Sequence, residues 1–110
     1  MKEQFQGKML RIYLTEAHKS QGKPLHEEIV ALCREIGIAG ATVYRGIEGF
    51  GASARIHRSR GFSASHDAPV TISIIDKEEN IEKLVPHLDA MIPSGLVAIS
   101  TVDVIRYSRS

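Results

Sequence analysis

A run of glycine and arginine residues in the middle of the chain carries the residue types best suited to binding a small anion. Glycines occupy positions 40, 46, 49 and 51, and the last two flank Phe50. Glycine reaches positive φ and admits close approach to its backbone, so the N–H groups around it can form a nest for phosphate oxygens. Arginine adds charge-assisted hydrogen bonds. The candidate arginines are Arg45, Arg55, Arg58 and Arg106.

Residues 51–67 are predicted to form a long, flexible and basic loop. Positions 55–60 hold three arginines and a histidine without an acidic residue. A loop of this length inside a compact domain is usually functional or disordered. We therefore assign a partner-binding role to this loop, through Arg55, His57, Arg58 and Arg60.

The length, composition and net charge of the chain limit the class of protein. The chain has 110 residues, 43% hydrophobic and 25% charged, which predicts one domain over residues 1–110. A net charge of +1 argues against nucleic-acid binding. Without an apolar stretch of about 18 residues or an apolar signal region, we expect a cytoplasmic protein with no membrane insertion. The single cysteine, Cys33, is expected to be a buried structural thiol.

Hydrophobic periodicity predicts four strands and two helices. Alternation marks strands, and apolar residues three and four apart mark helices. Residues 1–7 are expected to be loose, and the last strand is expected to carry a bulge or to change its partner midway, where Ser100, Thr101 and Asp103 interrupt it. The predicted strands are Met9–Leu14, Ala41–Ile47, Val70–Asp76 and Leu96–Tyr107, and the predicted helices are Pro24–Ile36 and Lys77–Met91.

Local signals refine the helix ends. Gly37 suits a left-handed position after the first helix. Asp76 and Glu79 have the spacing of a capping box at the start of the second. Pro86 is expected to kink the second helix or mark a weak point in it.

The element order β-α-β-β-α-β predicts an α+β, ferredoxin-like fold, with two helices on one face of an antiparallel sheet and a long loop between the second and third strands. The other sheet face would then carry Arg11 and Tyr13. Because that face lacks covering helices, we expect it to be buried against other subunits.

The stretch GIAGATVYRGIEGFG, Gly37–Gly51, resembles the PII signalling proteins, in which a glycine-rich strand end launches a long loop. The pattern G-A-T-V-x-R-G-I-x-G-F-G followed by R-I-H, Gly40–His57, is most similar to an uncharacterised family of small PII-like proteins. The segments MIPSGLVAIS and VDVIRY also correspond to the nucleotide-binding turn and the final basic strand of PII proteins. The resemblance therefore covers nearly the whole chain.

This resemblance implies a regulatory homotrimer that binds adenine nucleotides in clefts between subunits and reports them to a partner protein through the loop. Because the turn reads IPSGLV and no lysine follows Gly95, AMP or ADP is favoured over ATP. No other cofactor is implied. The implied nucleotide-binding residues, together with Arg45 from the residue pattern, are Thr42, Arg45, Gly49, Phe50, Gly51, Ser94, Gly95, Leu96 and Arg106.

The residues disfavour three other functions and leave a fourth open. An enzyme is disfavoured because the turn after Leu14 has no arginine and no acidic residue is placed to orient His57. RNA recognition is disfavoured because it would need aromatic residues on the central strands, whereas Val70–Asp76 has none and Met9–Leu14 has only Tyr13. Metal binding is disfavoured because the five histidines are scattered, although His57 and His66 could meet Asp67 if the loop folds back. The strongest alternative is a nucleotide-independent adaptor that docks on a transporter or channel.

Overall fold

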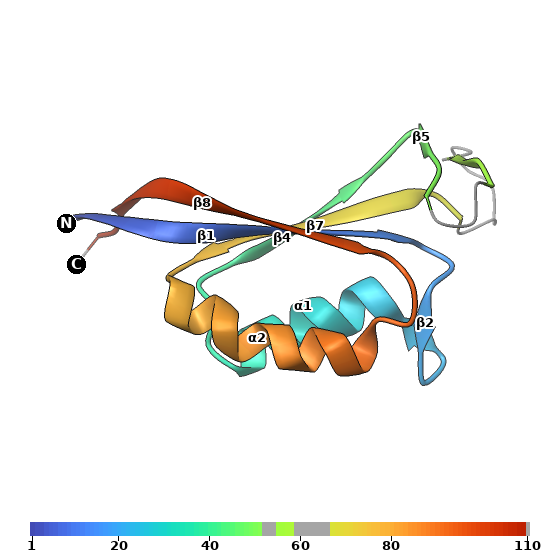
Figure 1. Ribbon diagram of the computed structural model, residues 1–110, viewed down its shortest axis with the longest axis horizontal. Coiled ribbons are helices and arrows are strands. Elements are labelled where there is room, and N and C mark those ends of the chain that lie inside the picture. Colours follow the sequence, from blue (N-terminus) through green and yellow to red (C-terminus); the bar gives the residue numbers. More distant parts are fainter. Residues whose placement is uncertain (52–54, 59–66, 110) are drawn as a thin grey trace.

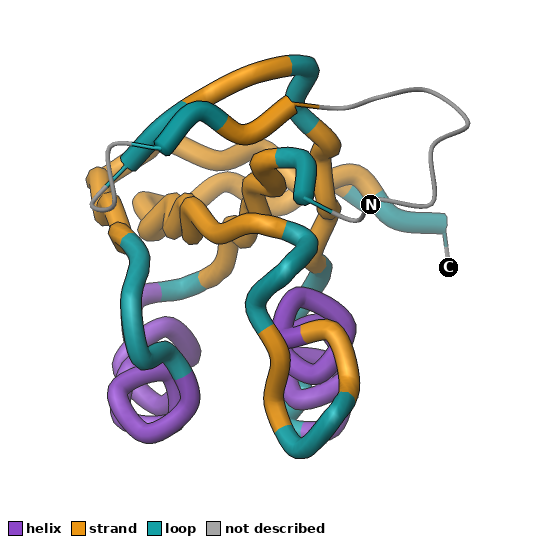
Figure 2. The backbone as a smooth tube through the Cα atoms, turned by 90° about the vertical axis from the view of Figure 1, so that its right-hand side faces the viewer, coloured by secondary structure: helices purple, strands orange, loops and turns teal. Residues whose placement is uncertain are grey.

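The described part of the chain folds into one four-stranded antiparallel sheet covered on one face by two helices. The computed structural model describes residues 1–51, 55–58 and 67–109. The strands β1 (Lys2–Thr15), β4 (Ala41–Arg45), β7 (Pro69–Asp76) and β8 (Leu96–Tyr107) lie in the order β4-β7-β1-β8. Both α1 (Leu25–Glu35) and α2 (Glu78–Met91) lie under the same sheet face (Figures 1 and 2). The predicted α+β, ferredoxin-like fold is confirmed.

Two short hairpins are added to this frame. The first joins β2 (Lys19–Ser20) to β3 (Lys23–Pro24), and its turn residues Gln21 and Gly22 both have positive φ, as a two-residue hairpin turn requires. The second joins β5 (Glu48–Gly49) to β6 (His57–Arg58) and rises from the open face of the sheet (Figure 1). Two of the residues assigned to the loop therefore pair with the strand that precedes it.

The core lies between the sheet and the helices and is aliphatic. Alternate residues of β1 and β7 point into it, as the sequence pattern predicted. Each helix contributes one apolar stripe. The most deeply buried side chains are Leu10, Ile12, Leu25, Ile29, Ile72, Ile74 and Leu84.

The end of α1 matches its prediction. Gly37 has φ +89°, and its N–H donates to the carbonyl of Arg34 while the N–H of Ile38 donates to that of Cys33. This pair of hydrogen bonds is the Schellman arrangement that ends many helices. Cys33 is buried on the inner face of α1, and burial raises the pKa of its thiol.

Two predictions about the strand ends are wrong. Residues 1–7 are not loose, because β1 begins at Lys2 and pairs with β8 as far as Tyr107. The register from Lys2↔Tyr107 to Tyr13↔Leu96 is continuous, so β8 has neither a bulge nor a change of partner over this length. β1 before Lys8 and β8 after Thr101 extend past β7 as a two-stranded arm, where exposed residues alternate with partly or fully buried ones. Ser100 and Thr101 lie just before the arm, where both are exposed to solvent.

The start of α2 also differs from its prediction. The N-cap is Lys77, without a side-chain cap, so Asp76 and Glu79 do not form a capping box. Asp76 is instead the last residue of β7, and its buried carboxylate accepts hydrogen bonds from the N–H of Lys77 and the side chain of Asn80. Helix α2 continues through Pro86 to Met91.

Candidate functional site

A cleft opens where three distant parts of the chain meet at one end of the sheet. It encloses about 660 Å³ between the end of β1, the β5–β6 hairpin and the turn before β8. Its polar side chains include Thr15, His18 and Asp67, and its apolar walls include Leu14, Pro69 and Val70. Of the predicted nucleotide-binding residues, five line it: Gly49, Phe50, Gly51, Ser94 and Gly95.

Gly95 allows the turn before β8 to lie directly against β1. Its φ is +153°, and a Cβ at this position would lie 2.9 Å from the carbonyl oxygen of Tyr13 and 3.0 Å from Cδ2 of Leu14. Any larger residue would push the turn away from the strand. The glycine therefore brings Ser94 and its own backbone to the floor of the cleft.

Gly46 plays the corresponding role on the opposite wall. Its N–H donates to the carbonyl of Pro69 at 2.7 Å, and a Cβ there would lie 2.9 Å from the Pro69 ring. This close approach lets the chain leave β4 and rise above the sheet into β5. The wall formed by Gly49, Phe50 and Gly51 depends on that departure.

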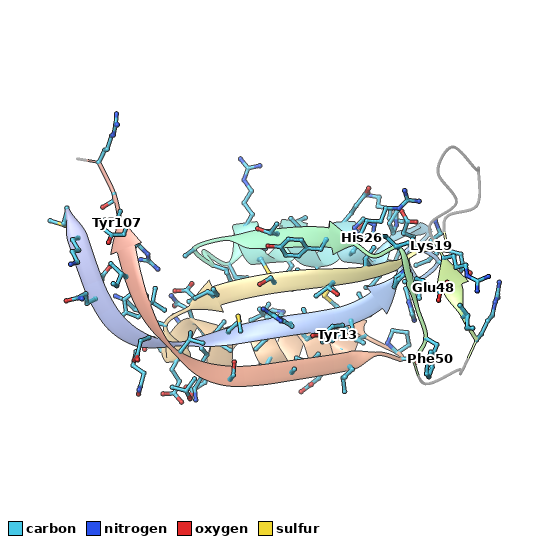
Figure 3. All side chains as sticks on the ribbon, turned by 90° about the horizontal axis from the view of Figure 1, so that it is seen from above. Tyr13, Lys19, His26, Glu48, Phe50 and Tyr107 are labelled. Atoms are coloured by element: carbon cyan, nitrogen blue, oxygen red, sulfur yellow. The ribbon has the colours of Figure 1, made fainter. Side chains whose placement is uncertain are left out.

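Two aromatic residues border the cleft. Tyr13 projects from β1 on the open face of the sheet, and Phe50 follows β5 at the same end of the molecule (Figure 3). Their exposed fractions are 40% and 73%, so both rings are accessible to a ligand. Aromatic faces of this kind can stack on a planar base.

The carboxylate of Glu16 ties the segments around the cleft together. Its Oε1 accepts hydrogen bonds from Nε and Nη2 of Arg45, at 3.2 and 3.1 Å, and from the backbone N–H of Ala68 at 3.2 Å. Its own N–H donates to the carbonyl of Ala68 at 2.9 Å. Arg45 is thus engaged with Glu16 and does not line the cleft.

The arginines of the loop meet acidic residues from outside the basic run. Nη2 of Arg55 lies 3.3 Å from Oδ2 of Asp67 at the cleft, and Nε of Arg58 lies 2.6 Å from Oε1 of Glu48. Local sequence did not reveal these pairs, because the β5–β6 pairing and the return of the chain to β7 create them. Arg60 and His66 lie outside the described residues, as does the His57 side chain.

The remaining predicted residues lie elsewhere. Thr42 is exposed in β4 opposite Ser73, and Leu96 begins β8 with 64% of its surface exposed. Arg106 is ten residues further along β8, which corresponds to about 33 Å of strand. There its guanidinium lies 3.5 Å from Oε1 of Glu3 and 5.2 Å from the centre of the Phe5 ring.

Tyr13 and His18 are among the cleft residues that sequence reasoning missed. Nδ1 of His18 accepts the backbone N–H of Thr15 at 3.0 Å, so Nε2 carries the proton of the neutral ring. The motif Thr15-Glu-Ala-His18 was interpreted only as a turn. This motif could have been recognised as part of a site because it follows a buried strand, at the same end of the sheet as the turn that contains Gly95.

The described residues also bear on metal binding and on membrane crossing. Among them, no group of three His, Cys, Asp or Glu side chains is placed to hold a metal ion. Neither α1 nor α2 has the length and apolar character needed to cross a membrane, and they are the helices that the described residues form.

Comparison with known proteins identifies the family. Residues 7–104 match the DUF190 family, described as "Uncharacterized ACR, COG1993". A UPF0166 protein of Aquifex aeolicus is 34% identical over 89% of this chain and 92% of its own length. The UPF0166 protein MJ1524 of Methanocaldococcus jannaschii is 38% identical over 84% of this chain and 86% of its own.

The fold is shared with solved structures of CPII, a nitrogen regulatory PII-like protein from Thiomonas intermedia K12. The complex of CPII with ADP, AMP and bicarbonate has a TM-score of 0.66 and 24% identity, over 93% of this chain and 91% of the CPII chain. The complex with ADP and bicarbonate has a TM-score of 0.62 and 25% identity over the same shares. The chain belongs to the DUF190 family, an uncharacterised family with the PII-like fold.

Proposed function

We propose that this chain is a PII-like regulatory protein, not an enzyme, that binds AMP or ADP in the cleft described above. The observation that carries the proposal is the meeting of two glycine turns from distant parts of the sequence. Gly49–Gly51 and Ser94–Gly95 line the same cleft. Their backbone N–H groups supply the kind of nest that binds phosphate oxygens.

The relatives support an adenine nucleotide as the ligand. CPII, which shares the fold, was solved with ADP and AMP. In the present chain the exposed rings of Tyr13 and Phe50 offer surfaces for a base, and the Ser94–Gly95 turn offers one for phosphates. No lysine follows Gly95, which favours AMP or ADP over the more highly charged ATP.

We further propose a homotrimer with the cleft completed by a neighbouring subunit. Two features favour assembly. Exposed apolar side chains, among them Tyr13 and Ile75, lie on the sheet face that no helix covers. Arg106 lies about 33 Å of strand from the cleft of its own chain, so a second copy would have to supply this cation to a bound phosphate.

The 51–67 loop would report the occupied cleft to a protein partner. Both ends of the loop border the cleft, through Gly51 and Arg55 on one side and Asp67 on the other. A ligand in the cleft would therefore contact both ends, and its binding would favour one arrangement of the residues between them. The identity of the partner is left open, with a transporter or channel as the expected class.

The experiment is a calorimetric titration of the purified protein with AMP, ADP and ATP. The proposal predicts saturable binding of AMP or ADP with one site per subunit, and weaker binding of ATP. Phe50→Leu should weaken binding because it removes a ring from the cleft, whereas His87→Leu should not. His87 is the control because it also carries an exposed ring, but lies on α2, on the opposite side of the sheet, and does not line the cleft. Absence of binding by all three nucleotides would exclude the proposal.

A nucleotide-independent adaptor is the second candidate, and one observation favours it. Ile47, Phe50 and Ile56 are 83%, 73% and 51% exposed around the β5–β6 hairpin. Exposed apolar residues that lie together often mark a protein interface. Under this alternative, Arg106→Ala leaves partner binding intact, whereas under the nucleotide proposal it removes nucleotide binding.

A further inference from the structure

The cleft is surrounded by three chain segments that one carboxylate joins. Glu16 lies in the turn after β1, Arg45 is the last residue of β4, and Ala68 immediately precedes β7. The last two flank the segment 46–67, which includes the β5–β6 hairpin and the basic loop. Oε1 of Glu16 accepts three N–H hydrogen bonds from these two residues, at 3.1 to 3.2 Å.

The neighbours of these three residues line the cleft. Thr15 and Ala17 flank Glu16, Gly46 follows Arg45, and Asp67 and Pro69 flank Ala68. Glu16, Arg45 and Ala68 are themselves absent from the lining. The carboxylate therefore lies behind the wall and contacts segments whose adjacent residues line the cleft.

We propose that Glu16 is the positioning residue of the cleft: it holds both ends of the 46–67 segment against the β1 turn and so sets the width of the binding site. This inference rests on the proposed function for its ligand, but its structural part can be measured without one. It also gives Arg45 a role as the partner of Glu16 in this clamp.

The clamp is stronger than an ordinary surface ion pair. The Glu16 side chain is only 16% exposed and the Arg45 side chain 43% exposed, so solvent screens the carboxylate weakly. Glu16 and Ala68 are joined by two hydrogen bonds: the backbone N–H of Glu16 donates to the carbonyl of Ala68, and the N–H of Ala68 donates to the Glu16 carboxylate. By contrast, the charged atoms of Lys23 and Glu28 are 3.8 Å apart, the lysine side chain is 73% exposed, and neither residue lines the cleft.

The first test measures amide hydrogen exchange by NMR in Glu16→Ala and Arg45→Met. Both substitutions should speed exchange at Ala68 and Gly46, whose N–H groups bond to Glu16 and Pro69, while the amide of Ile72 in the centre of β7 stays protected. Glu16→Gln should give an intermediate result, because its amide oxygen still accepts the Ala68 N–H but carries no charge for Arg45. Unchanged exchange at Ala68 and Gly46 in both variants would overturn the proposal.

The second test measures ADP affinity of the same variants by calorimetry. Glu16→Ala and Arg45→Met should each weaken ADP binding by about fivefold or more. Because the two residues belong to one hydrogen-bond network, the double variant should weaken binding by less than the product of the two single fold-changes. Arg45→Lys should restore part of the affinity, and the control Glu28→Gln should leave it unchanged. Faster exchange with unchanged affinity would overturn the positioning role.

The failures of the two proposals can be told apart. If the unsubstituted protein binds no nucleotide, the proposed function is wrong, and the exchange measurement then decides by itself whether Glu16 holds the two ends together. If the unsubstituted protein binds ADP and the variants bind it equally well, only the positioning role fails. The melting temperature of each variant shows whether that variant folds. If Glu16→Ala does not fold, Arg45→Met still tests the proposal, because it replaces a partly exposed side chain.

Discussion

Oδ2 of Asp76 accepts a hydrogen bond of 2.9 Å from the backbone N–H of Ala39. Ala39 lies between α1 and β4, and Asp76 is the last residue of β7, so the bond joins the α1–β4 connection to the end of β7 that precedes α2. The carboxylate is 2% exposed and also accepts N–H groups from Lys77 and Asn80, with Arg106 3.7 Å away. A buried charge is thereby fully hydrogen-bonded at the start of the two-stranded arm.

This arrangement predicts a loss of stability in acid. Burial acts to raise the pKa of Asp76, but the hydrogen bonds from Asn80, Ala39 and Lys77 and the charge of Arg106 outweigh it, so the pKa lies below its ordinary value. A depressed folded-state pKa stabilises the fold above the unfolded-state value of about 3.9, and this contribution is lost as the pH falls through the folded-state pKa.

Urea unfolding from pH 7 to pH 2.5 measures this contribution. The free energy of unfolding should fall below about pH 4 in the unsubstituted protein, and less steeply in Asp76→Asn, which cannot ionise. At pH 7, Asp76→Ala should cost about 1–3 kcal/mol or more, because buried N–H groups lose their acceptor. Asp89→Asn, an exposed position on α2, is the control. Parallel pH profiles for the Asp76→Asn variant and the unsubstituted protein would contradict the role of Asp76.

The sequence pattern predicted the frame well because burial controls it. Leu10, Ile12 and Ile72 alternate on two strands, and the helices repeat apolar residues at three and four positions, so their buried faces could be assigned. The β1 side of the arm, Lys2–Gly7, was missed because its side chains lie outside the core and its mostly polar residues give no apolar alternation. The predicted strand Leu96–Tyr107 matches β8, but the polar residues in it were interpreted as a bulge or a change of partner.

Gly95→Ala is predicted to damage both stability and the cleft. The added Cβ would lie 2.9 Å from the carbonyl oxygen of Tyr13, and the backbone has φ +153°. We expect a loss of about 1–3 kcal/mol in the free energy of unfolding, from steric overlap and backbone strain. Gly40→Ala is the matched control, because a Cβ added there would meet nothing within 4 Å. Equal melting temperatures for the two variants would contradict the close packing of the turn on β1.

Gly7→Ala tests whether the arm is anchored as described. A Cβ at Gly7 would lie 2.7 Å from the backbone oxygen of Asp76 and 3.1 Å from the Phe5 ring. Since the backbone of Asp76 is held in β7 by its pairing with β1, we expect a loss of about 1–3 kcal/mol in the free energy of unfolding, measured by urea unfolding. Gln6→Ala, an exposed neighbour on the same strand, should change stability by less than about 0.5 kcal/mol. A neutral Gly7→Ala would mean that the N-terminal segment is loose after all.

Ile75→Asp tests the proposed assembly through the open sheet face. Ile75 is 42% exposed on the face opposite the helices, so a charge there should reduce the mass in solution from that of a trimer to that of a monomer. Light scattering after size-exclusion chromatography measures this mass. Ala90→Asp is the control, because Ala90 is exposed on α2, on the helix side of the sheet. An unsubstituted protein that runs as a monomer would refute the trimer.

The site was less predictable than the frame, because its residues meet only after folding. The glycine turns could be identified from their spacing and from the resemblance to PII proteins. The clamp could not, since Glu16, Arg45 and Ala68 belong to three segments and no local pattern joins them. Arg45 therefore looked like a free cation in the sequence, whereas Glu16 engages it in the structure.

Nucleotide binding in a cleft completed by a second subunit is tested most directly by calorimetric titration of ADP into the unsubstituted protein, Arg106→Ala and the control Arg109→Ala. Arg109 is a second arginine near the C-terminus and is exposed beyond the end of β8. We predict one ADP per subunit for the unsubstituted protein and for Arg109→Ala, and loss of binding for Arg106→Ala. No binding of ADP or AMP to the unsubstituted protein would contradict nucleotide sensing, and the adaptor alternative would then take its place.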